Sequence, residues 1–344
     1  MRARDFGIVI GTFPTGAHNA VTDVPGVKVG HTTLVSGASV RTGVTVILPH
    51  DGDTFAEPVF AGYHWLNGNG ELTGLAYVRE LGMLASPIGL TSTGSVGVVR
   101  DALSALDPGG QGWSLPVVGE TWDGSLNDIT GRHVTAEHVV EAFASASTGP
   151  VAEGAAGGGT GMICHGFKGG AGTASRVAGG YTVGVYVQAN HGHRERLTVN
   201  GVNVGRRLGA SEVPHEGAGS IIGVVATDAP LLPHQCARLA RRAGLGVGRT
   251  GGAGENSSGD GFLCFSVGNR NLPVNVLGAE VPPTYQVTVM ADDHLDPLYH
   301  AVIEATEEAI VNALVAGDTM TGFNGLTVEG LDGARLASLL PATR

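Results

Sequence analysis

The sequence predicts an α/β fold in which sheets of short, buried strands are covered by a smaller number of helices. Short runs rich in β-branched residues recur along the 344-residue chain, and most of them are apolar on both faces. Strands of this kind are buried on both sides. Glycine contributes 57 residues, about 17% against a usual share of roughly 7%, so many backbone segments must pack closely.

Six runs are predicted to be strands, and three segments are predicted to be helices. The strands are VTVILP (44–49), SVGVVR (95–100), YTVGVYVQA (181–189), SIIGVVAT (220–227), FLCFSVG (262–268) and TYQVTVM (284–290). The helices are 135–146, 230–243 and 296–316, where apolar residues recur at helical spacing. Thr135 is the expected N-cap of the first helix, Gly244 is expected to end the second, and Pro297 lies in the first turn of the third.

The composition fits one well-packed domain over residues 1–344. Apolar residues make up 42% of the chain and charged residues only 15%, and no repeat of fixed period is visible. Residues 200–219 are polar and rich in glycine, and they lack apolar periodicity. This stretch is predicted to be a surface linker, which is an accessible place for a chain break.

The charge pattern and the apolar runs argue against several kinds of partner. The formal net charge is -11, and no run of Lys or Arg occurs, which argues against nucleic acid and anionic membranes. No apolar stretch reaches the roughly 18 residues that a membrane-spanning helix needs, and the N-terminal apolar run is too short for a secretory signal. A cytoplasmic location is therefore expected. The cysteines lack paired spacing and are predicted to be free buried thiols; they are Cys164, Cys236 and Cys264.

A serine at the start of a predicted strand is the first candidate nucleophile. Ser220 follows Gly219 in the junction GAGSIIGVVATDAPL (217–231). After a cut before Ser220, the free α-amino group, with a pKa of about 7.7–8.0, can act as general base for the serine's own hydroxyl. Glycine at the preceding position tolerates the strained backbone that an N-to-O acyl shift requires. The same pattern fits a Gly-Ser pair that merely opens a strand.

A glycine turn before the strand 262–268 holds the second candidate, in GENSSGDGFLCF (254–265). Ser258 and Asp260 lie two residues apart, so in an extended chain their side chains point to the same side and can orient an ammonium group or a serine. Ser257 or Ser258 is a rival nucleophile. A turn that only caps a hairpin explains the pattern without any function.

The glycine-rich segment 153–175 contains Lys168, one of two lysines in the chain. The phosphate-binding pattern G-x-x-x-x-G-K-[ST] fails, because Phe167 precedes the lysine and glycines follow it. Two interpretations stay open. The ammonium group is either held among close-packed backbones, where its pKa can shift and it can donate to an oxyanion, or incidental on a loop.

Polar residues also follow the predicted strand 181–189, in QANHGHR (188–194). Asn190 either donates an amide N–H to an oxyanion or caps the loop. His191 and His193 have H-x-H spacing, but no third ligand can be placed, so no metal site is predicted. A second polar run, VVGETWDGSLNDITGRH (117–133), is predicted to form mostly turns; its polar residues are Glu120, Trp122, Asp123, Asn127, Asp128 and His133.

Six blocks, taken together and in order, carry a resemblance that covers nearly the whole chain. They are NAVTDVPGVKVGHTT (19–33), VVGETWDGSLND (117–128), GPVAEGAAGGGTGMICHGFKGG (149–170), YTVGVYVQANHG (181–192), GSIIGVVATDAPLLP (219–233) and NSSGDGFLCFS (256–266). This pattern resembles the L-aminopeptidase/D-esterase (DmpA-like) family, of the S58 peptidase type, which includes the β-peptidyl aminopeptidases. The resemblance implies an αββα sandwich like that of the N-terminal-nucleophile hydrolases and of ornithine acetyltransferase.

The resemblance also implies a role for each candidate. The chain would cut itself into an α chain (1–219) and a β chain (220–344), which assemble as a homotetramer of αβ units. Ser220 matches the nucleophile and Asn190 the oxyanion-hole asparagine, and the pair at the nucleophile's amino group corresponds to Ser258 and Asp260. Lys168 falls on a lysine position of nylon-hydrolase relatives. Trp122 departs from the family, because some relatives carry a catalytic tyrosine there and an indole has no ionisable hydroxyl.

The predicted function is that of a self-processing aminopeptidase, amidase or esterase that releases N-terminal residues from small substrates without a metal or a cofactor. Glu120, Trp122 and His165 are predicted to bind the substrate, with an acidic residue on its ammonium group. Two alternatives stay open. One is an acyltransferase of related fold, whose acceptor is an amine, and the other is an uncleaved, non-catalytic binding module, which Trp122 suggests.

Overall fold

Two sheets lie face to face in the computed structural model, which describes residues 1–107, 114–214, 219–273 and 280–341. The larger sheet has the order β4 (Met83–Leu84), β3 (Val59–Trp65), β14 (Gly261–Ser266), β13 (Ile221–Thr227), β10 (Tyr181–Ala189) and β9 (Gly170–Ala178). The smaller has the order β1 (Lys28–Ser36), β2 (Val40–Leu48), β5 (Ile88–Ser92) and β6 (Val117–Thr121). Neighbouring strands are antiparallel except for β13 with β14 and β5 with β6.

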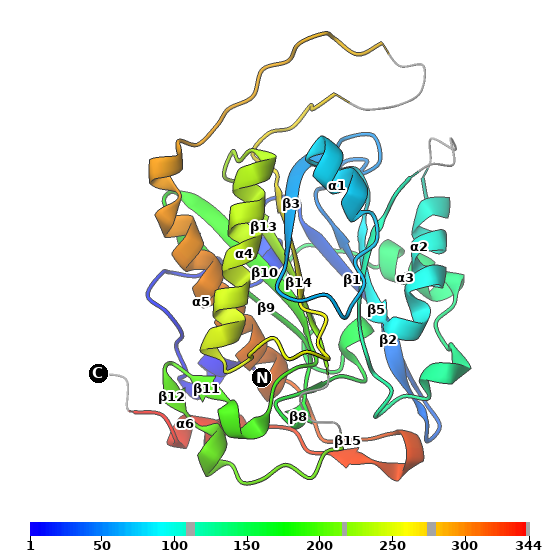
Figure 1. Cartoon of the computed structure of the whole chain (residues 1–344), viewed down its shortest axis with the longest axis vertical. Coiled ribbons are helices and arrows are strands. Elements are labelled where there is room, and N and C mark those ends of the chain that lie inside the picture. Colours follow the sequence, from blue (N-terminus) through cyan, green and yellow to red (C-terminus); the bar gives the residue numbers. More distant parts are fainter. Residues whose placement is uncertain (108–113, 215–218, 274–279, 342–344) are drawn as a thin grey trace.

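Helices cover the outer face of each sheet (Figure 1). The larger sheet is covered by α4 (Pro233–Arg249) and α5 (Asp296–Val315), and the smaller by α2 (Val96–Ala105) and α3 (Ala136–Ala144). The predicted αββα sandwich is therefore confirmed. Shorter elements lie around it: α1 (Leu75–Leu81), α6 (Gly333–Ser338), β7 (Ile163–Cys164), β8 (Phe167–Lys168), β11 (Thr198–Val199), β12 (Val202–Asn203), β15 (Met320–Thr321) and β16 (Thr327–Val328).

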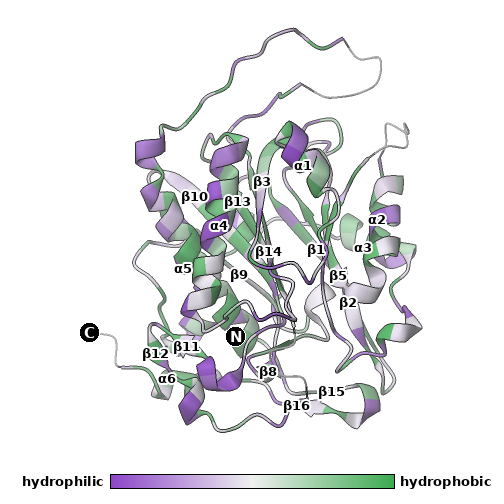
Figure 2. Ribbon diagram, in the orientation of Figure 1, coloured by the Kyte–Doolittle hydropathy of each residue, from purple (hydrophilic) through white to green (hydrophobic). Residues whose placement is uncertain are grey.

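Buried apolar side chains form three clusters, one in each space between the four layers. Figure 2 shows hydrophobic residues along the strands and helices of these layers. The space between the sheets holds Leu90, Tyr186 and Ile222, all fully buried. Because both faces of the central strands are covered, the apolar runs 181–189 and 220–227 become β10 and β13, as predicted. The three cysteines are buried and free, also as predicted.

Two of the predicted strands are wrong. Residues 95–100 begin α2 instead, because Val99, Ala102 and Leu103 continue the apolar pattern at helical spacing and are buried against the smaller sheet. Residues 284–290 form no strand: they alternate in the right way, but Tyr285 and Val289 are exposed and no sheet pairs with them. A strand needs a partner as well as a pattern.

The predicted ends of α3 and α5 are close to those observed, but α4 does not end at Gly244. It continues to Arg249. A Cβ on Gly246 would lie only 2.5 Å from Cβ of Thr306 on α5. Gly246 therefore allows close approach of the two helices, and Gly244 lies inside α4 rather than marking a C-cap.

The stretch 200–219 is less loose than predicted. It contains β12 and a turn of 3-10 helix at Gly205–Arg207, and the side chains of Val204 and Leu208 are buried. Residues 215–218 lie outside the described residues. The predicted linker is therefore anchored to the body of the molecule up to Leu208.

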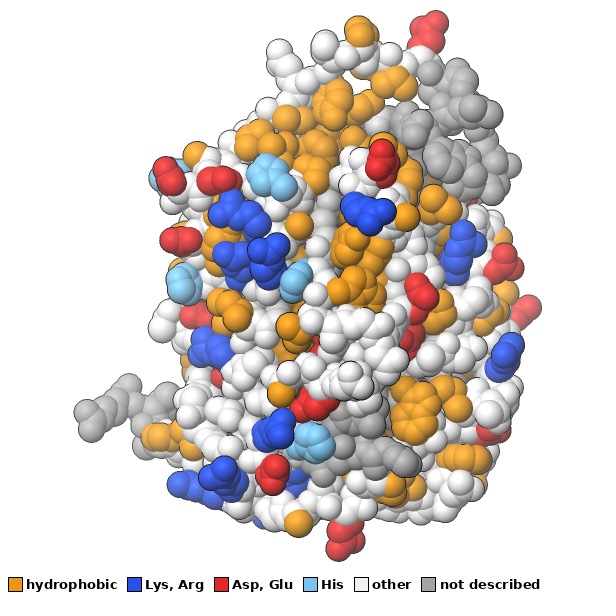
Figure 3. Space-filling model, in the orientation of Figure 1, with side chains coloured by type: hydrophobic (Ala, Val, Ile, Leu, Met, Phe, Trp, Pro, Cys, Tyr) orange, Lys and Arg blue, Asp and Glu red, His pale blue; other side chains and the backbone are white. Residues whose placement is uncertain are grey.

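On the surface seen in Figure 3, a group of basic side chains lies over α4. Two of them, Arg238 and Arg242, lie over the ring of Tyr299, with guanidinium carbons 5.5 and 3.9 Å from its centroid. None of the described helices is long and apolar enough to cross a membrane.

Candidate active site

Ser220 lies directly before β13, near the middle of the larger sheet. Its side chain is buried, and Oγ accepts a hydrogen bond from the backbone N–H of Gly259 at 2.9 Å. Its carbonyl oxygen accepts one from the backbone N–H of Asn190 at 3.0 Å. Gly259 precedes β14 and Asn190 follows β10, so the ends of both neighbouring strands hold the serine.

The side chain of Asn190 lies beside the peptide bond between Gly219 and Ser220. Nδ2 donates to the carbonyl oxygen of Trp122 at 2.8 Å, and Oδ1 accepts from the backbone N–H of Ile163 at 2.7 Å. A Cβ on Gly219 would lie 1.6 Å from the carbonyl oxygen of Asn190 and 2.6 Å from its Nδ2. Any side chain at position 219 would clash, so only glycine fits before Ser220.

Ser258 contacts the carbonyl oxygen of the same peptide bond. Its Oγ donates to the carbonyl oxygen of Gly219 and lies 2.5 Å from Oδ1 of Asp260. The same carboxylate oxygen accepts from the backbone N–H of Ile221 at 3.1 Å. Burial raises the pKa of Asp260. The structure thus brings Ser258 and Asp260 together with Ser220, as expected for three parts of one site.

The loop after β3 supports this turn, and the sequence reasoning missed it. Asn67 donates from Nδ2 to Oδ2 of Asp260 at 2.9 Å, and its Oδ1 accepts from the backbone N–H of Asp260 at 2.6 Å. Asn69 donates to the carbonyl oxygen of Ser257 at 2.7 Å, while the Ser257 side chain is exposed. The sequence NGNG (67–70) is a strong turn signal, and it was the available clue.

Glu120, at the end of β6, is buried next to that loop. Oε1 accepts from the backbone N–H of Glu71 at 3.0 Å, and Oε2 accepts from the hydroxyl of Thr93. Burial raises the pKa of Glu120. A Cβ on Gly70 would lie 3.3 Å from Glu120 Oε1 and 2.8 Å from Cα of Gly259. The loop therefore bridges this carboxyl to the turn before β14.

A pocket of about 490 Å³ opens on the same loop. Two aromatic residues of β3, Tyr63 and Trp65, form part of its wall, and Asn67 links it to Asp260. The other lining residues are Gly68, Gly70, Glu71, Leu72 and Leu75. Its walls suit a small, partly apolar group.

Trp122 reaches the site through its backbone. Its carbonyl oxygen accepts from Asn190, whereas its indole lies over Gly124, where a Cβ would be 2.5 Å from Cζ2. The side chain is 37% exposed.

Asp123 and Glu120 are buried, and Asp123 accepts from the hydroxyl of Ser92 at 2.8 Å. The prediction that 117–133 forms mostly turns is wrong for Glu120, which lies in β6, but it is confirmed for Asp123, whose carbonyl oxygen accepts from the backbone N–H of Leu126 at 3.0 Å.

Lys168 is fully buried and holds the glycine-rich segment together. Its Nζ donates to the carbonyl oxygens of Gly159, Met162 and Gly169 at 3.3, 3.1 and 2.7 Å. Three acceptors use all three hydrogens of the ammonium group. Burial lowers its pKa to about 7. Of the two interpretations, the structure supports the one in which close-packed backbones hold the lysine.

The two histidines of the H-x-H pair lie in different surroundings. His191 is buried, and its ring lies 5.2 Å from that of His165, centroid to centroid. The ring of His193 is 35% exposed, with Nε2 4.0 Å from Oε1 of Glu255. His165 occupies the turn between β7 and β8, where Nδ1 lies 3.1 Å from the carbonyl oxygen of His193. A substrate contact for His165 stays a prediction.

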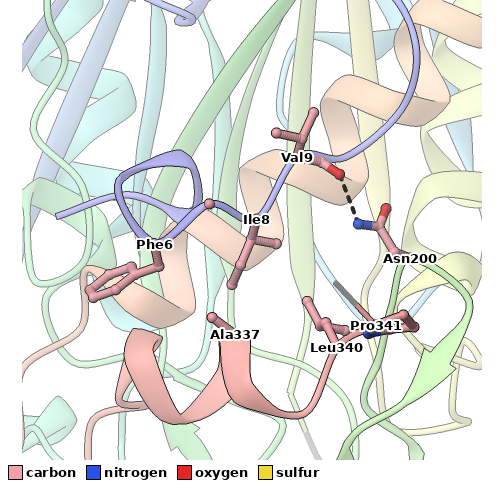
Figure 4. A pocket seen from close by; sticks show the side chains of 8 residues that line it. Phe6, Ile8, Val9, Asn200, Ala337, Leu340 and Pro341 are labelled. Carbon is pink, nitrogen blue, oxygen red and sulfur yellow. Dashed lines mark hydrogen bonds between the residues drawn. The ribbon is translucent and has the colours of Figure 1, made fainter. Parts of the chain in front are cut away.

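A second pocket, of about 420 Å³, is lined by described residues that do not suit catalysis (Figure 4). It lies between the N-terminal segment and the residues after α6, and Asn200 donates to the carbonyl oxygen of Val9 at its edge, at 2.8 Å. The remaining lining residues are Phe6, Gly7, Ile8, Ala337, Leu340 and Pro341. No titratable side chain is among these described residues, so they supply no acid, base or nucleophile.

Comparisons with known proteins point to one family. The model of peptidase family S58 matches residues 19–328. A β-peptidyl aminopeptidase of Sphingosinicella microcystinivorans is 47% identical over 100% of this chain and 92% of its own. A second, from Sphingosinicella xenopeptidilytica, is 43% identical over 99% of this chain and 91% of its own.

Solved structures give the same picture. A β-aminopeptidase of a Burkholderia species has a TM-score of 0.95 and 55% identity, covering 98% of both chains. An L-aminopeptidase D-Ala-esterase/amidase from Ochrobactrum anthropi, described as a variant of the Ntn-hydrolase fold, has a TM-score of 0.91 and 43% identity. The match covers 98% of this chain and 97% of that one.

Proposed function

The chain belongs to peptidase family S58, and on this premise we propose that it cuts its own backbone between Gly219 and Ser220 and then uses Ser220 as nucleophile. It is a hydrolase, an aminopeptidase, esterase or amidase of the N-terminal-nucleophile type. One observation carries the proposed cut: the hydroxyl of Ser258 donates to the carbonyl oxygen of Gly219, the residue before the nucleophile.

Self-cleavage starts with attack of Ser220 Oγ on the carbonyl carbon of Gly219. The carbonyl oxygen takes the negative charge, and Ser258 already donates a hydrogen bond to it. Asp260 accepts hydrogen bonds from the backbone N–H of Ile221 and from Asn67, and its Oδ1 lies 2.5 Å from Ser258 Oγ, so this carboxyl positions the Ser258 hydroxyl beside the carbonyl oxygen. The C–N bond then breaks, the proton from Oγ passes to the leaving nitrogen, and water hydrolyses the ester.

The freed amino group of Ser220 serves as general base in turnover. Its pKa, about 7.7–8.0 in an unperturbed chain, suits proton transfer near neutral pH. Asn190 uses one amide hydrogen on Trp122 and has a second for the oxyanion of the acyl-enzyme. Ser258 lies next to the new amino group, because its hydroxyl contacts the carbonyl oxygen of the peptide bond from which that group is freed, and Asp260 lies 2.5 Å from Ser258. Water releases the acyl group.

The substrates are small peptides, amides or esters with a free N-terminal amino group. The buried carboxyl of Glu120 binds the ammonium group, and the pocket beside Asn67 takes a neighbouring side chain. The names of two relatives, β-peptidyl aminopeptidase and β-aminopeptidase, support the inclusion of N-terminal β-amino residues among the substrates. The family resemblance supports a homotetramer of αβ units, and three free thiols suit a cytoplasmic location.

Mass spectrometry of the purified protein, combined with product analysis, tests this proposal. We expect two chains, residues 1–219 and 220–344, and release of free N-terminal residues from unblocked α- and β-peptides but not from N-acetylated ones. A single intact chain after long incubation would contradict self-cleavage. Products that appear only with an added amine acceptor would make the protein an acyltransferase.

Glu120→Gln is expected to raise KM for peptides with a free amino group about 30-fold, because loss of a buried charge partner costs roughly 2 kcal/mol or more. Glu120 binds an ammonium group only as carboxylate, which is present above its pKa. Burial raises that pKa. As the solution is acidified, KM should therefore begin to rise at a higher pH than it would with a glutamate of ordinary pKa. Steady-state kinetics across pH measure both effects.

Glu80→Gln is the matched control, because that side chain is exposed on α1 and does not line the pocket. It should leave KM within about twofold of the original value. An equal rise in KM for an ester without an amino group would show that Glu120→Gln disturbs the pocket rather than ammonium binding.

A further inference from the structure

Three buried side chains from two separate segments converge near the end of β10. They are Cys164 at the end of β7, His165 in the following turn, and His191 two residues after β10. One potential ligand atom from each lies within 4.8 Å of the other two, and Cys164 Sγ is 3.8 Å from His191 Nδ1. We propose that these three residues bind a thiophilic metal ion, Zn²⁺, a property that the peptidase activity does not require.

The hairpin turn orients the first imidazole for this role. A two-residue turn of His165 and Gly166 joins Cys164 to Phe167, and both turn residues have positive φ, 49° and 68°. The carbonyl oxygen of His193 can only accept, so His165 Nδ1 carries the hydrogen of their 3.1 Å contact. In the neutral ring the lone pair is then on Nε2. Histidine ligands of metals are typically fixed by such a bond from the other nitrogen.

Two glycines make room for the two rings. A Cβ on Gly192, whose φ is +85°, would lie 2.3 Å from Cε1 of His165. A Cβ on Gly252 would lie 2.9 Å from Cδ2 of His191.

The spacing and chemistry suit zinc. Tetrahedral zinc, with Zn–S near 2.3 Å and Zn–N near 2.0–2.1 Å, separates sulfur from nitrogen by about 3.6 Å. The observed separation of Cys164 Sγ and His191 Nδ1 is 3.8 Å. A thiolate with two imidazoles selects zinc or copper over magnesium or calcium. When zinc binds, it displaces the thiol proton of Cys164, which passes to solvent, and a Zn–S bond forms.

Such an ion would join the two segments that hold Asn190. The backbone N–H of His165 donates to the carbonyl oxygen of His191 at 2.7 Å, and Ile163, next to Cys164, donates to Oδ1 of Asn190. Bound zinc would therefore stiffen the turn beside Ser220. The test does not need catalysis, so it can fail or succeed independently of the proposed function.

The experiment uses the full-length protein, purified under reducing conditions and stripped with a chelator. Zinc at about 100 times its dissociation constant should raise Tm by roughly 5 °C, with one ion bound per chain by elemental analysis. Cobalt(II) should give the near-ultraviolet charge-transfer band of a thiolate ligand and strong visible bands of tetrahedral coordination.

Cys164→Ser and His191→Asn should remove stoichiometric zinc binding. The matched controls are Cys236→Ser, a buried thiol on α4, and His193→Asn, which keeps the backbone carbonyl that His165 contacts. Both controls should bind one ion. A cobalt spectrum of the unmodified protein without the thiolate band, or zinc binding unchanged in Cys164→Ser, would overturn the proposal even if His191→Asn fails to fold.

Discussion

Replacing Ser220 with alanine is expected to leave the chain uncut and to lower kcat/KM for every substrate by at least about 10⁴-fold. The serine hydroxyl is the attacking group in both reactions, and its buried Oγ is held by a hydrogen bond from the backbone N–H of Gly259. Denaturing electrophoresis reports the cut, and a chromogenic amide reports turnover.

Ser257→Ala is the matched control for this experiment. Ser257 is exposed and neighbours the site only through its backbone, so the variant should cut itself and turn over substrate at close to the original rates. Two bands that persist in Ser220→Ala would contradict self-cleavage by this serine, and loss of both reactions in Ser257→Ala would make that residue the nucleophile.

Ser258→Ala is expected to slow self-cleavage by about 10²- to 10³-fold, the usual loss when one oxyanion donor is removed. The hydroxyl of Ser258 contacts the carbonyl oxygen of Gly219, where negative charge develops, so its removal acts on the transition state. The rate of appearance of the fragment 220–344 after synthesis in a cell-free system measures the effect.

Ser258→Thr keeps the hydroxyl and should restore a measurable part of the rate. If Ser258→Ala cuts itself as fast as the unmodified chain, the contact with Gly219 has no part in the cut. If Ser258→Ala and Ser258→Thr both cut themselves slowly and at the same rate, the loss of rate is due to altered packing in the turn.

The apolar runs predict the α/β class and the central strands, because these depend on local sequence, whereas the αββα sandwich is implied by the family resemblance. The strands β10 and β13 are buried on both faces, and their sequences are apolar almost without interruption. The run 95–100 misleads because a six-residue window is too short to separate a strand from the first turns of a helix, and Leu103 lies outside it. The run 284–290 has the alternation of a strand, but only a neighbouring strand could make it one.

The site is predictable where its residues fall in family blocks and unpredictable where it depends on contacts across the chain. Ser258 and Asp260 lie two residues apart in sequence and could be paired from this spacing alone. Asn67, which holds Asp260 by two hydrogen bonds, lies 193 residues away from it. The grouping of Cys164 with His191 likewise spans 27 residues, whereas spacing suggested the pair His191 and His193.

The strand order of the larger sheet has a consequence for assembly. After a cut before Ser220, β13 and β14 belong to one fragment, and the strands on either side of them belong to the other. The fragments are thus interleaved, and parting them would expose four unpaired strand edges that invite aggregation. Synthesis as one precursor makes the meeting of the two halves an intramolecular event. Two separately expressed halves would have to find each other as open sheets, so the uncut precursor acts as an assembly tether.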